Sequence, residues 1–216
     1  MDDELRVRRL PEYQSSDRAD LDAILDDALV AHLGVVRDGR PVVLPFACAR
    51  DGDGLLLHGS TGAGVLRRGV DAEVCVTVTH LDGLVFARSL FESSVHYRSA
   101  VVLGVAEVLE GERKERALEV LSDHLLPGRS GELRTSTRKE LAATLVLRVP
   151  LERWSVKIGR SDAHDPEDDE PRDVWAGIVP LWLAAGRPEP APDVPDGVAV
   201  PASARRAAAR GGRLAP

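Results

Sequence analysis

Turn signals divide residues 32–59 into three short apolar runs. The runs are rich in β-branched and aliphatic residues, and they are separated by Asp38-Gly39 and by the Asp-Gly-Asp-Gly sequence at residues 51–54. Asp-Gly pairs flanked by such runs are typical of tight β-hairpins. The segment therefore predicts a three-stranded antiparallel meander, which any fold of this chain has to contain.

Further strand patterns follow the meander. Residues 73–89 alternate as a strand that we expect to turn at Asp82-Gly83 and to continue as a second strand. Residues 97–111 and residues 144–159 predict one strand each. Apolar spacing predicts helices over residues 15–29, 61–69, 112–128 and 136–144. Six to seven antiparallel strands with few helices indicate a mainly β fold of the barrel type.

The domain organisation follows from length and local composition. A chain of 216 residues is long enough to bury one core. We expect one barrel domain over residues 1–185, with the apolar residues near Trp175 and Trp182 docked on the core. Residues 186–216, rich in Pro, Ala and Arg, predict an extended C-terminal tail. The acidic residues 162–173 predict a solvated loop.

Charge and composition argue against several classes of partner. The formal net charge of -7 disfavours nucleic acid, because its phosphates would be repelled. No apolar run approaches the roughly 18 residues needed to cross a bilayer, and the charged first residues do not resemble a secretory signal. We therefore expect a cytoplasmic protein without a membrane partner. Cys48 and Cys75 stand in apolar runs, which predicts buried free thiols, and no cluster of closely spaced metal ligands is apparent.

Residues 55–69 carry a candidate phosphate site. A strand is predicted to end at His58, and a helix is predicted to begin near Thr61 and to carry Arg67. Free N–H groups at a helix start, the hydroxyls of Ser60 and Thr61 and a nearby guanidinium would suit a phosphate monoester. An ordinary turn is the alternative, since Gly and Ser are common turn residues. The sequence matches neither the P-loop nor the dinucleotide fingerprint.

Two other stretches carry candidate ligand residues. Polar side chains crowd residues 93–99, directly before an apolar strand, and such a group at the mouth of a barrel often lines a ligand site. An ordinary loop is the alternative there. In residues 154–160, Trp154 could stack on a ring and Lys157 could meet an anion. Their alternatives are a core Trp and a solvated Lys.

The order of these pieces resembles a known family. The first helix, the meander, the helix with Arg67, the alternating strand and the Trp-Ser-Val-Lys strand are similar to the pyridoxamine-phosphate-oxidase-like flavoproteins. Within them, the chain most resembles the branch of nitroimidazole-resistance and other flavin-nucleotide-binding proteins. The resemblance covers residues 7–183, and its most specific elements are LLLHGSTG and HYRSAVVLG. It implies a split β-barrel of Greek-key-like order, built as a homodimer that holds FMN between its subunits.

The resemblance also implies which residues meet FMN. The backbone of residues 43–45 would border the isoalloxazine ring, residues 58–61 and Arg67 would meet the ribityl chain and phosphate, and residues 97–99 would approach the flavin. Trp154 and Lys157 would reach it from the other subunit. The full set of implied cofactor residues is Val43, Leu44, Pro45, His58, Gly59, Ser60, Thr61, Arg67, Tyr97, Arg98, Ser99, Trp154 and Lys157.

The function implied by the resemblance is a flavin-dependent oxidoreductase acting on a small-molecule redox substrate, with a nitroreductase-type reaction as one form. Arg98 or Lys157 would stabilise the reduced flavin. His58 and His96 are candidate proton donors, with a structural role as the alternative for each. The Arg-Lys phosphate pair and the C-terminal arginine motif of true pyridoxamine-phosphate oxidases have no clear match, which argues against vitamin B6 oxidation.

A second hypothesis is a non-catalytic protein that binds or stores flavin or haem on the same fold. His58, His96 or His164 would then be candidate ligands of the haem iron. A deazaflavin coenzyme would need more basic residues around its anionic tail than the sequence offers. Retention of flavin without reduction by nicotinamide donors would favour this hypothesis over the oxidoreductase.

Overall fold

The meander forms as the sequence predicts. The computed structural model describes residues 3–160 and 173–210. Within them, β2 (Val30–Arg37), β3 (Arg40–Asp51) and β4 (Gly54–Ser60) are consecutive antiparallel strands. Asp38, Gly39 and Gly52 have positive φ angles in the two turns. Asp and Gly tolerate this backbone region best, so the turn residues place the two hairpins.

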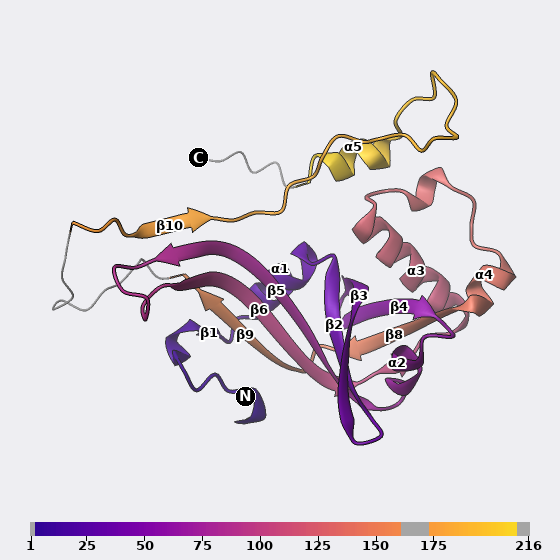
Figure 1. The fold of residues 1–216 in the computed structure, drawn as a ribbon. Helices are drawn as coiled ribbons and strands as arrows, with labels where there is room; N and C mark the ends of the chain where they lie inside the picture. The colour runs from indigo at the N-terminus through magenta and orange to yellow at the C-terminus, as the bar shows by residue number, and fades with distance from the viewer. Residues whose placement is uncertain (1–2, 161–172, 211–216) are drawn as a thin grey trace.

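The described residues form ten strands (Figure 1), more than the six to seven predicted. The other strands are β1 (Gln14–Ser15), β5 (Glu73–Phe86), β6 (Ser94–Val105), β7 (Glu107–Val108), β8 (Thr144–Pro150), β9 (Arg153–Gly159) and β10 (Gly177–Pro180). Two-residue strands are too short to show a sequence pattern. The single strand predicted over residues 144–159 is also wrong, because it breaks after Pro150 into β8 and β9. The mainly β, antiparallel class is confirmed.

The strand order is β1-β9-β6-β5-β2-β3-β4-β8-β7, with β10 paired to β5 outside this path. Over residues 3–160 and 173–210, five helices pack around the sheet: α1 (Arg18–Asp27), α2 (Gly64–Arg68), α3 (Gly111–Leu125), α4 (Arg138–Ala143) and α5 (Ala202–Ala208). Short 3-10 turns are η1 (Asp3–Leu5), η2 (Pro11–Tyr13) and η3 (Ser130–Glu132). None of the helices in the described ranges is long and apolar enough to cross a membrane.

Two apolar clusters form the core. The larger one joins α1 and α2 to the inner face of the sheet, and its fully buried members include Leu21, Leu33 and Leu57. The smaller one joins α3 to the other face of β4 through Leu56 and Leu121. Alternate residues of a strand point to opposite faces, so the two neighbouring leucines of β4 serve both clusters. β4 is therefore buried on both faces.

β5 departs from the predicted turn at Asp82-Gly83. The strand continues to Phe86, and the only register shift against β6 falls between Leu81 and Gly83, which marks a β-bulge at Asp82. The Asp82 carboxylate accepts hydrogen bonds from Arg98 Nε at 2.9 Å and Nη2 at 3.1 Å. The predicted turn is therefore wrong, because a strand partner and an ion pair hold the Asp-Gly pair in extended backbone.

The C-terminal segment contains a helix where an extended tail was predicted. Residues 186–201 contain two turns and neither helix nor strand, but α5 follows them and its Ser203 is 2% exposed. Figure 1 shows the chain crossing from β10 to α5, which lies near α3. Trp175 and Trp182 are 65% and 54% exposed, so they do not dock on the core of this chain. The acidic residues 162–172 and His164 lie outside the described residues.

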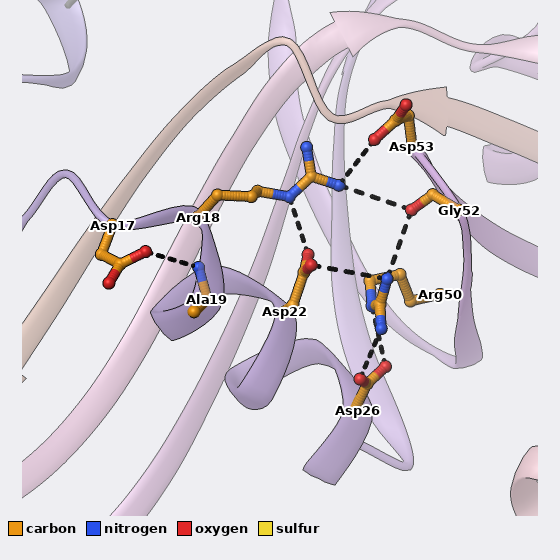
Figure 2. Close-up of polar contacts among 8 residues, drawn as sticks. All are labelled: Asp17, Arg18, Ala19, Asp22, Asp26, Arg50, Gly52 and Asp53. Atoms are coloured by element: carbon orange, nitrogen blue, oxygen red, sulfur yellow. Dashed lines mark hydrogen bonds and ion pairs between the residues drawn. The ribbon is translucent and has the colours of Figure 1, made fainter.

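An ion-pair network fixes α1 to the turn between β3 and β4 (Figure 2). Arg18 Nε lies 2.7 Å from Asp22 Oδ1, and its Nη2 lies 2.9 Å from Asp53 Oδ1. Arg50 Nη2 lies 2.6 Å from Asp26 Oδ2. These contacts hold the turn end of the β3–β4 hairpin against the helix. The other end of the hairpin carries the features of a site.

Candidate functional site

The strands β3 and β4 separate along their length. They pair from Asp51 and Gly54 up to Cys48 and Leu57, and no strand of the described chain occupies the facing edge of β3 over residues 42–47. Beyond Leu57, β4 pairs only with β8. Both segments expected to meet a flavin, residues 43–45 and residues 58–61, lie on the two sides of this separation.

A pocket of about 550 Å³ lies where β4 leads into α2. It is lined by Thr61, Gly62, Arg67, Val70 and Leu145. The volume is within the range of small-molecule and cofactor sites. Thr61 and Arg67 were predicted for the phosphate end of the site. Val70 and Leu145 were missed, because an apolar residue next to a turn gives no local signal of ligand contact.

The pocket end of α2 is suited to an anion. The helix begins after Ala63 with no side-chain cap, so the N–H groups of its first turn have no side-chain acceptor. Ser60 Oγ accepts a hydrogen bond from the Gly62 N–H at 3.1 Å, which tightens the turn before the helix. Arg67 is exposed and forms no ion pair with any described residue. A guanidinium that lines the pocket without a carboxylate partner among the described residues favours a negatively charged ligand.

The predicted group at residues 97–99 is divided between two faces of the sheet. Tyr97 and Ser99 share the outer face with Lys157, whose Nζ lies 5.9 Å from the centre of the Tyr97 ring. Arg98 points to the inner side, where Nη1 lies 3.0 Å from Asp27 Oδ2 of α1. Together with the contacts to Asp82, this ion pair fixes Arg98 in the fold, and hydrogen bonding to Asp82 raises the pKa of its guanidinium. Its expected contact with a flavin stays a prediction.

Trp154 and Lys157 also differ in surroundings. Trp154 packs against the larger core cluster, as the structural alternative for it predicted. Lys157 lies on the outer face, and its Nζ donates a hydrogen bond to the Arg9 carbonyl at 3.3 Å. Lys157 has no carboxylate partner among the described residues. Of this pair, only Lys157 is placed to meet an anion.

Four of the six histidines fall into two groups. His80 and His124 each place Nε2 within 2.9 Å of a backbone carbonyl, which explains them structurally. The buried Nδ1 of His58 and the buried Nε2 of His96 have no hydrogen-bond partner among the residues that the structure describes. Burial lowers the pKa of His58, so its imidazole is neutral near pH 7. Buried imidazole nitrogens without a hydrogen-bond partner are rare in proteins, and such a nitrogen can coordinate a metal.

The two cysteines differ in burial. Cys48 is fully buried, and burial raises the pKa of its thiol to about 12. Cys75 is half-buried, so the predicted burial holds in full only for Cys48. Both are free thiols, and neither lines the pocket.

Comparison with known proteins identifies the family. The family model described as pyridoxamine 5'-phosphate oxidase matches residues 17–158, which include β2 to β8, most of β9 and the pocket. The chain belongs to the pyridoxamine 5'-phosphate oxidase-like family. Its curled antiparallel sheet is the split barrel of that family. Among curated proteins, none matches the chain.

Two solved structures are similar to this family member over nearly their whole length. An FAD and haem binding protein from Mycobacterium smegmatis is 46% identical, with a TM-score of 0.87 over 90% of this chain and 96% of the other. The flavocytochrome Anf3 from Azotobacter vinelandii is 32% identical, with a TM-score of 0.89 over 95% of this chain and 96% of the other.

A 5-nitroimidazole resistance protein from Bacteroides thetaiotaomicron is more distant. It is 23% identical, with a TM-score of 0.56 over 67% of this chain and 86% of the other. That likeness concerns the fold alone.

Proposed function

We propose that this protein binds a flavin nucleotide at the separation of β3 and β4, with a phosphate group in the α2 pocket. The observation that carries the proposal is the pocket lined by Thr61, Gly62 and the unpaired Arg67. The free edge of β3 offers backbone groups to a flat ring, and the Thr61 hydroxyl and the Arg67 guanidinium line the pocket that would take a phosphate. Flavin binding also fits the family to which the chain belongs.

FAD is the preferred flavin in this proposal, in place of the FMN expected from the sequence. The M. smegmatis relative, at 46% identity, is an FAD and haem binding protein. In FAD the phosphate that ends FMN continues into an adenylate, which needs a way out of the pocket. Thr61, Gly62 and Arg67 are all exposed, so the phosphate end of this pocket opens to solvent. A longer nucleotide can therefore extend past it.

Haem is the second ligand that we propose. The M. smegmatis relative is an FAD and haem binding protein, and the A. vinelandii relative is described as a flavocytochrome. The residues present fit this group in one respect: His58 and His96 each keep a buried ring nitrogen without a hydrogen-bond partner. Either would supply the imidazole ligand that haem iron commonly takes. His164 lies outside the described residues and stays a sequence-based candidate.

The proposed activity is therefore the binding of a flavin and haem for electron transfer. Of the two hypotheses drawn from the sequence, a flavin or haem binding protein is better supported than a reductase with a particular substrate. A bound flavin supplies hydride or one-electron chemistry, and haem supplies a one-electron centre. The chain's own part is to hold the phosphate with Arg67 and to keep the imidazole of His58 neutral through burial.

The flavin proposal is tested by the absorption spectrum of the purified protein and by the mass of the released cofactor. We expect flavin bands that co-migrate with the protein, and FAD as the released molecule. FMN alone would correct the choice of nucleotide. A protein that is colourless and retains neither added FAD nor added FMN would refute the proposal.

The haem proposal is tested by adding haem to the apoprotein and following the Soret band. We expect the band to shift in wild type and to change in one or both of His58→Ala and His96→Ala. His32→Ala is the matched control, because His32 is exposed on β2. An unchanged Soret band in both single variants and in their double variant would remove these histidines from the proposal.

A further inference from the structure

The corner where α4 meets β8 forms one wall of the α2 pocket. Leu145, the second residue of β8, lines the pocket. The Thr61 N–H donates a hydrogen bond at 2.9 Å to the carbonyl of Ala143, the last residue of α4. Figure 1 shows α2 and α4 at the same end of β4. The pocket therefore borders α2 on one side and the end of α4 on the other.

The segment around α4 carries an excess of positive charge. Arg138 and Lys139 are exposed, and neither forms an ion pair or a side-chain hydrogen bond over the described ranges. The carboxylate of Glu140 is already paired, since its Oε1 lies 2.6 Å from Arg134 Nη2. Residues 133–145 contain three basic residues and one acidic residue, in a chain whose net charge is -7. Two unpaired cations beside a pocket favour an anionic ligand.

Contacts at both ends hold α4 in place. At its start, Thr137 and Glu140 form a capping box: Thr137 Oγ1 accepts from the Glu140 N–H at 3.3 Å, and Glu140 Oε2 accepts from the Thr137 N–H at 2.7 Å. Near its end, Lys114 Nζ of α3 donates to the Leu141 carbonyl at 2.6 Å. The short helix is therefore a fixed part of the pocket's surroundings, and its side chains start from defined backbone positions.

The two free cations of α4 lie about one helical turn from the pocket wall. Lys139 precedes Ala143 by four residues, so the two share a face of the helix and are about 6 Å apart along its axis. Arg138 is the next residue toward the start of the helix. Arg67, which lines the pocket, comes from α2. A ligand with one phosphate at Arg67 and a second one further out would therefore meet cations of both helices.

We propose that Arg138 and Lys139 bind the second phosphate of FAD, which FMN lacks, and thereby determine which flavin the protein prefers. The inference rests on the proposed function, because it extends the same site. Arg67 meets the phosphate that both flavins share, and the α4 cations meet the one that joins it to the adenosine. Charge-assisted hydrogen bonds from Arg and Lys to phosphate are strong. FMN ends at its single phosphate and gains nothing from α4.

The test is a calorimetric titration of the full-length apoprotein with FAD and, separately, with FMN. We expect wild type to bind FAD more tightly than FMN. The variant R138A/K139A is expected to raise the dissociation constant for FAD at least tenfold and to leave that for FMN within about twofold. Alanine is the best helix former, so α4 should persist in this variant. Circular dichroism and the melting temperature without ligand check that the fold is unchanged.

Two further variants separate a local contact from a change in net charge. R138K/K139R keeps both positive charges and is expected to retain the preference for FAD. R116A/R187A removes two positive charges from exposed residues that have no ion pair over the described ranges. Arg116 follows Lys114 by two residues, a rotation of about 200° around α3, so it points away from α4. This control is expected to leave both dissociation constants unchanged.

Three outcomes would overturn the inference. R138A/K139A could bind FAD as tightly as wild type does, it could lose affinity for FAD and FMN equally, or R116A/R187A could reproduce its loss for FAD. The proposed function fails in a different way. A wild type that binds FMN but not FAD would refute the role of α4 and leave the α2 pocket as a flavin site, whereas a wild type that binds neither flavin would refute both.

Discussion

The two halves of the β3–β4 hairpin have the same strands but opposite surroundings. In the paired half, from Cys48 to Leu57, side chains are buried on both faces and α1 is bound to the turn by ion pairs. In the separated half, Val43 and Leu44 are 58% and 43% exposed, and β4 runs on into the pocket. Packing stabilises the paired half. The separated half carries little of that packing, so it is available to contact a ligand. The two halves should therefore respond differently to substitution.

The largest difference is expected for leucine truncation. Leu57→Ala removes a fully buried side chain from the paired half and should lower the free energy of unfolding by about 2–5 kcal/mol. Leu44→Ala, in the separated half, should lower it by less than about 1 kcal/mol, because much of the side chain already meets water. Chemical denaturation of both variants measures the contrast. Equal losses would show that the two halves are packed alike.

The next effect concerns ligand affinity. Arg67→Ala should weaken the binding of FAD or FMN about 10- to 100-fold, since a charge-assisted hydrogen bond contributes about 1.5–3 kcal/mol. The melting temperature without ligand should not move. Arg68→Ala is the control: Arg68 is on the same helix but does not line the pocket, and its Nη2 is 3.9 Å from Asp38. Equal affinity losses in both variants would contradict a specific phosphate contact.

A smaller effect is expected from the network on α1. Arg50→Ala removes the contacts to Asp26 and should destabilise the fold by about 1 kcal/mol or less, because the ion pair is partly exposed to solvent. Flavin affinity should be retained. The thermal midpoint and a flavin titration of the same variant check both statements. A loss of flavin binding would show that the ion-pair network between α1 and the β3–β4 turn also determines how β3 and β4 separate.

The smallest effect is a pH dependence at His58. Burial lowers the pKa of His58 in the folded chain, so just below pH 6.5 the unfolded chain binds a proton at this imidazole more readily than the folded chain does. His58 therefore contributes stability above its ordinary pKa of 6.5, and that contribution is lost as the pH falls below it. Unfolding of His58→Gln and wild type between pH 7.5 and 5 measures the difference. If the stability of wild type relative to His58→Gln instead increased as the pH falls, the expected direction of the pH dependence would be wrong.

Local signals predicted the elements that depend on neighbouring residues. The meander followed from Asp38-Gly39 and from residues 51–54. Thr61 and Arg67, which are six positions apart, line one pocket, and their contact with a phosphate stays a prediction. The Asp82-Gly83 pair carries the same signal as those turns, yet Arg98 and β10 hold it in a strand. No local pattern distinguishes the two outcomes, because the deciding contacts come from distant segments.

Two other differences have separate causes. α5 has no apolar periodicity, and its first turn is capped by Glu132, a residue 71 positions earlier in the chain. That capping contact could not be read from the sequence. The placement of Tyr97, Arg98 and Ser99 could have been, because neighbouring residues of a strand cannot all face one ligand. Strand alternation alone separates Arg98 from the other two.

The free edge of β3 has a consequence for solubility. Unpaired strand edges invite the edges of other chains and so promote aggregation. The Cys48 N–H donates to the Leu29 carbonyl, on the β2 side of β3. Successive N–H groups of a strand point to opposite edges, so the N atoms of residues 41, 43, 45 and 47 point to the free edge. Two of these residues are Pro41 and Pro45, which have no N–H to donate. The edge left open to a flavin is thus a poor template for a foreign strand.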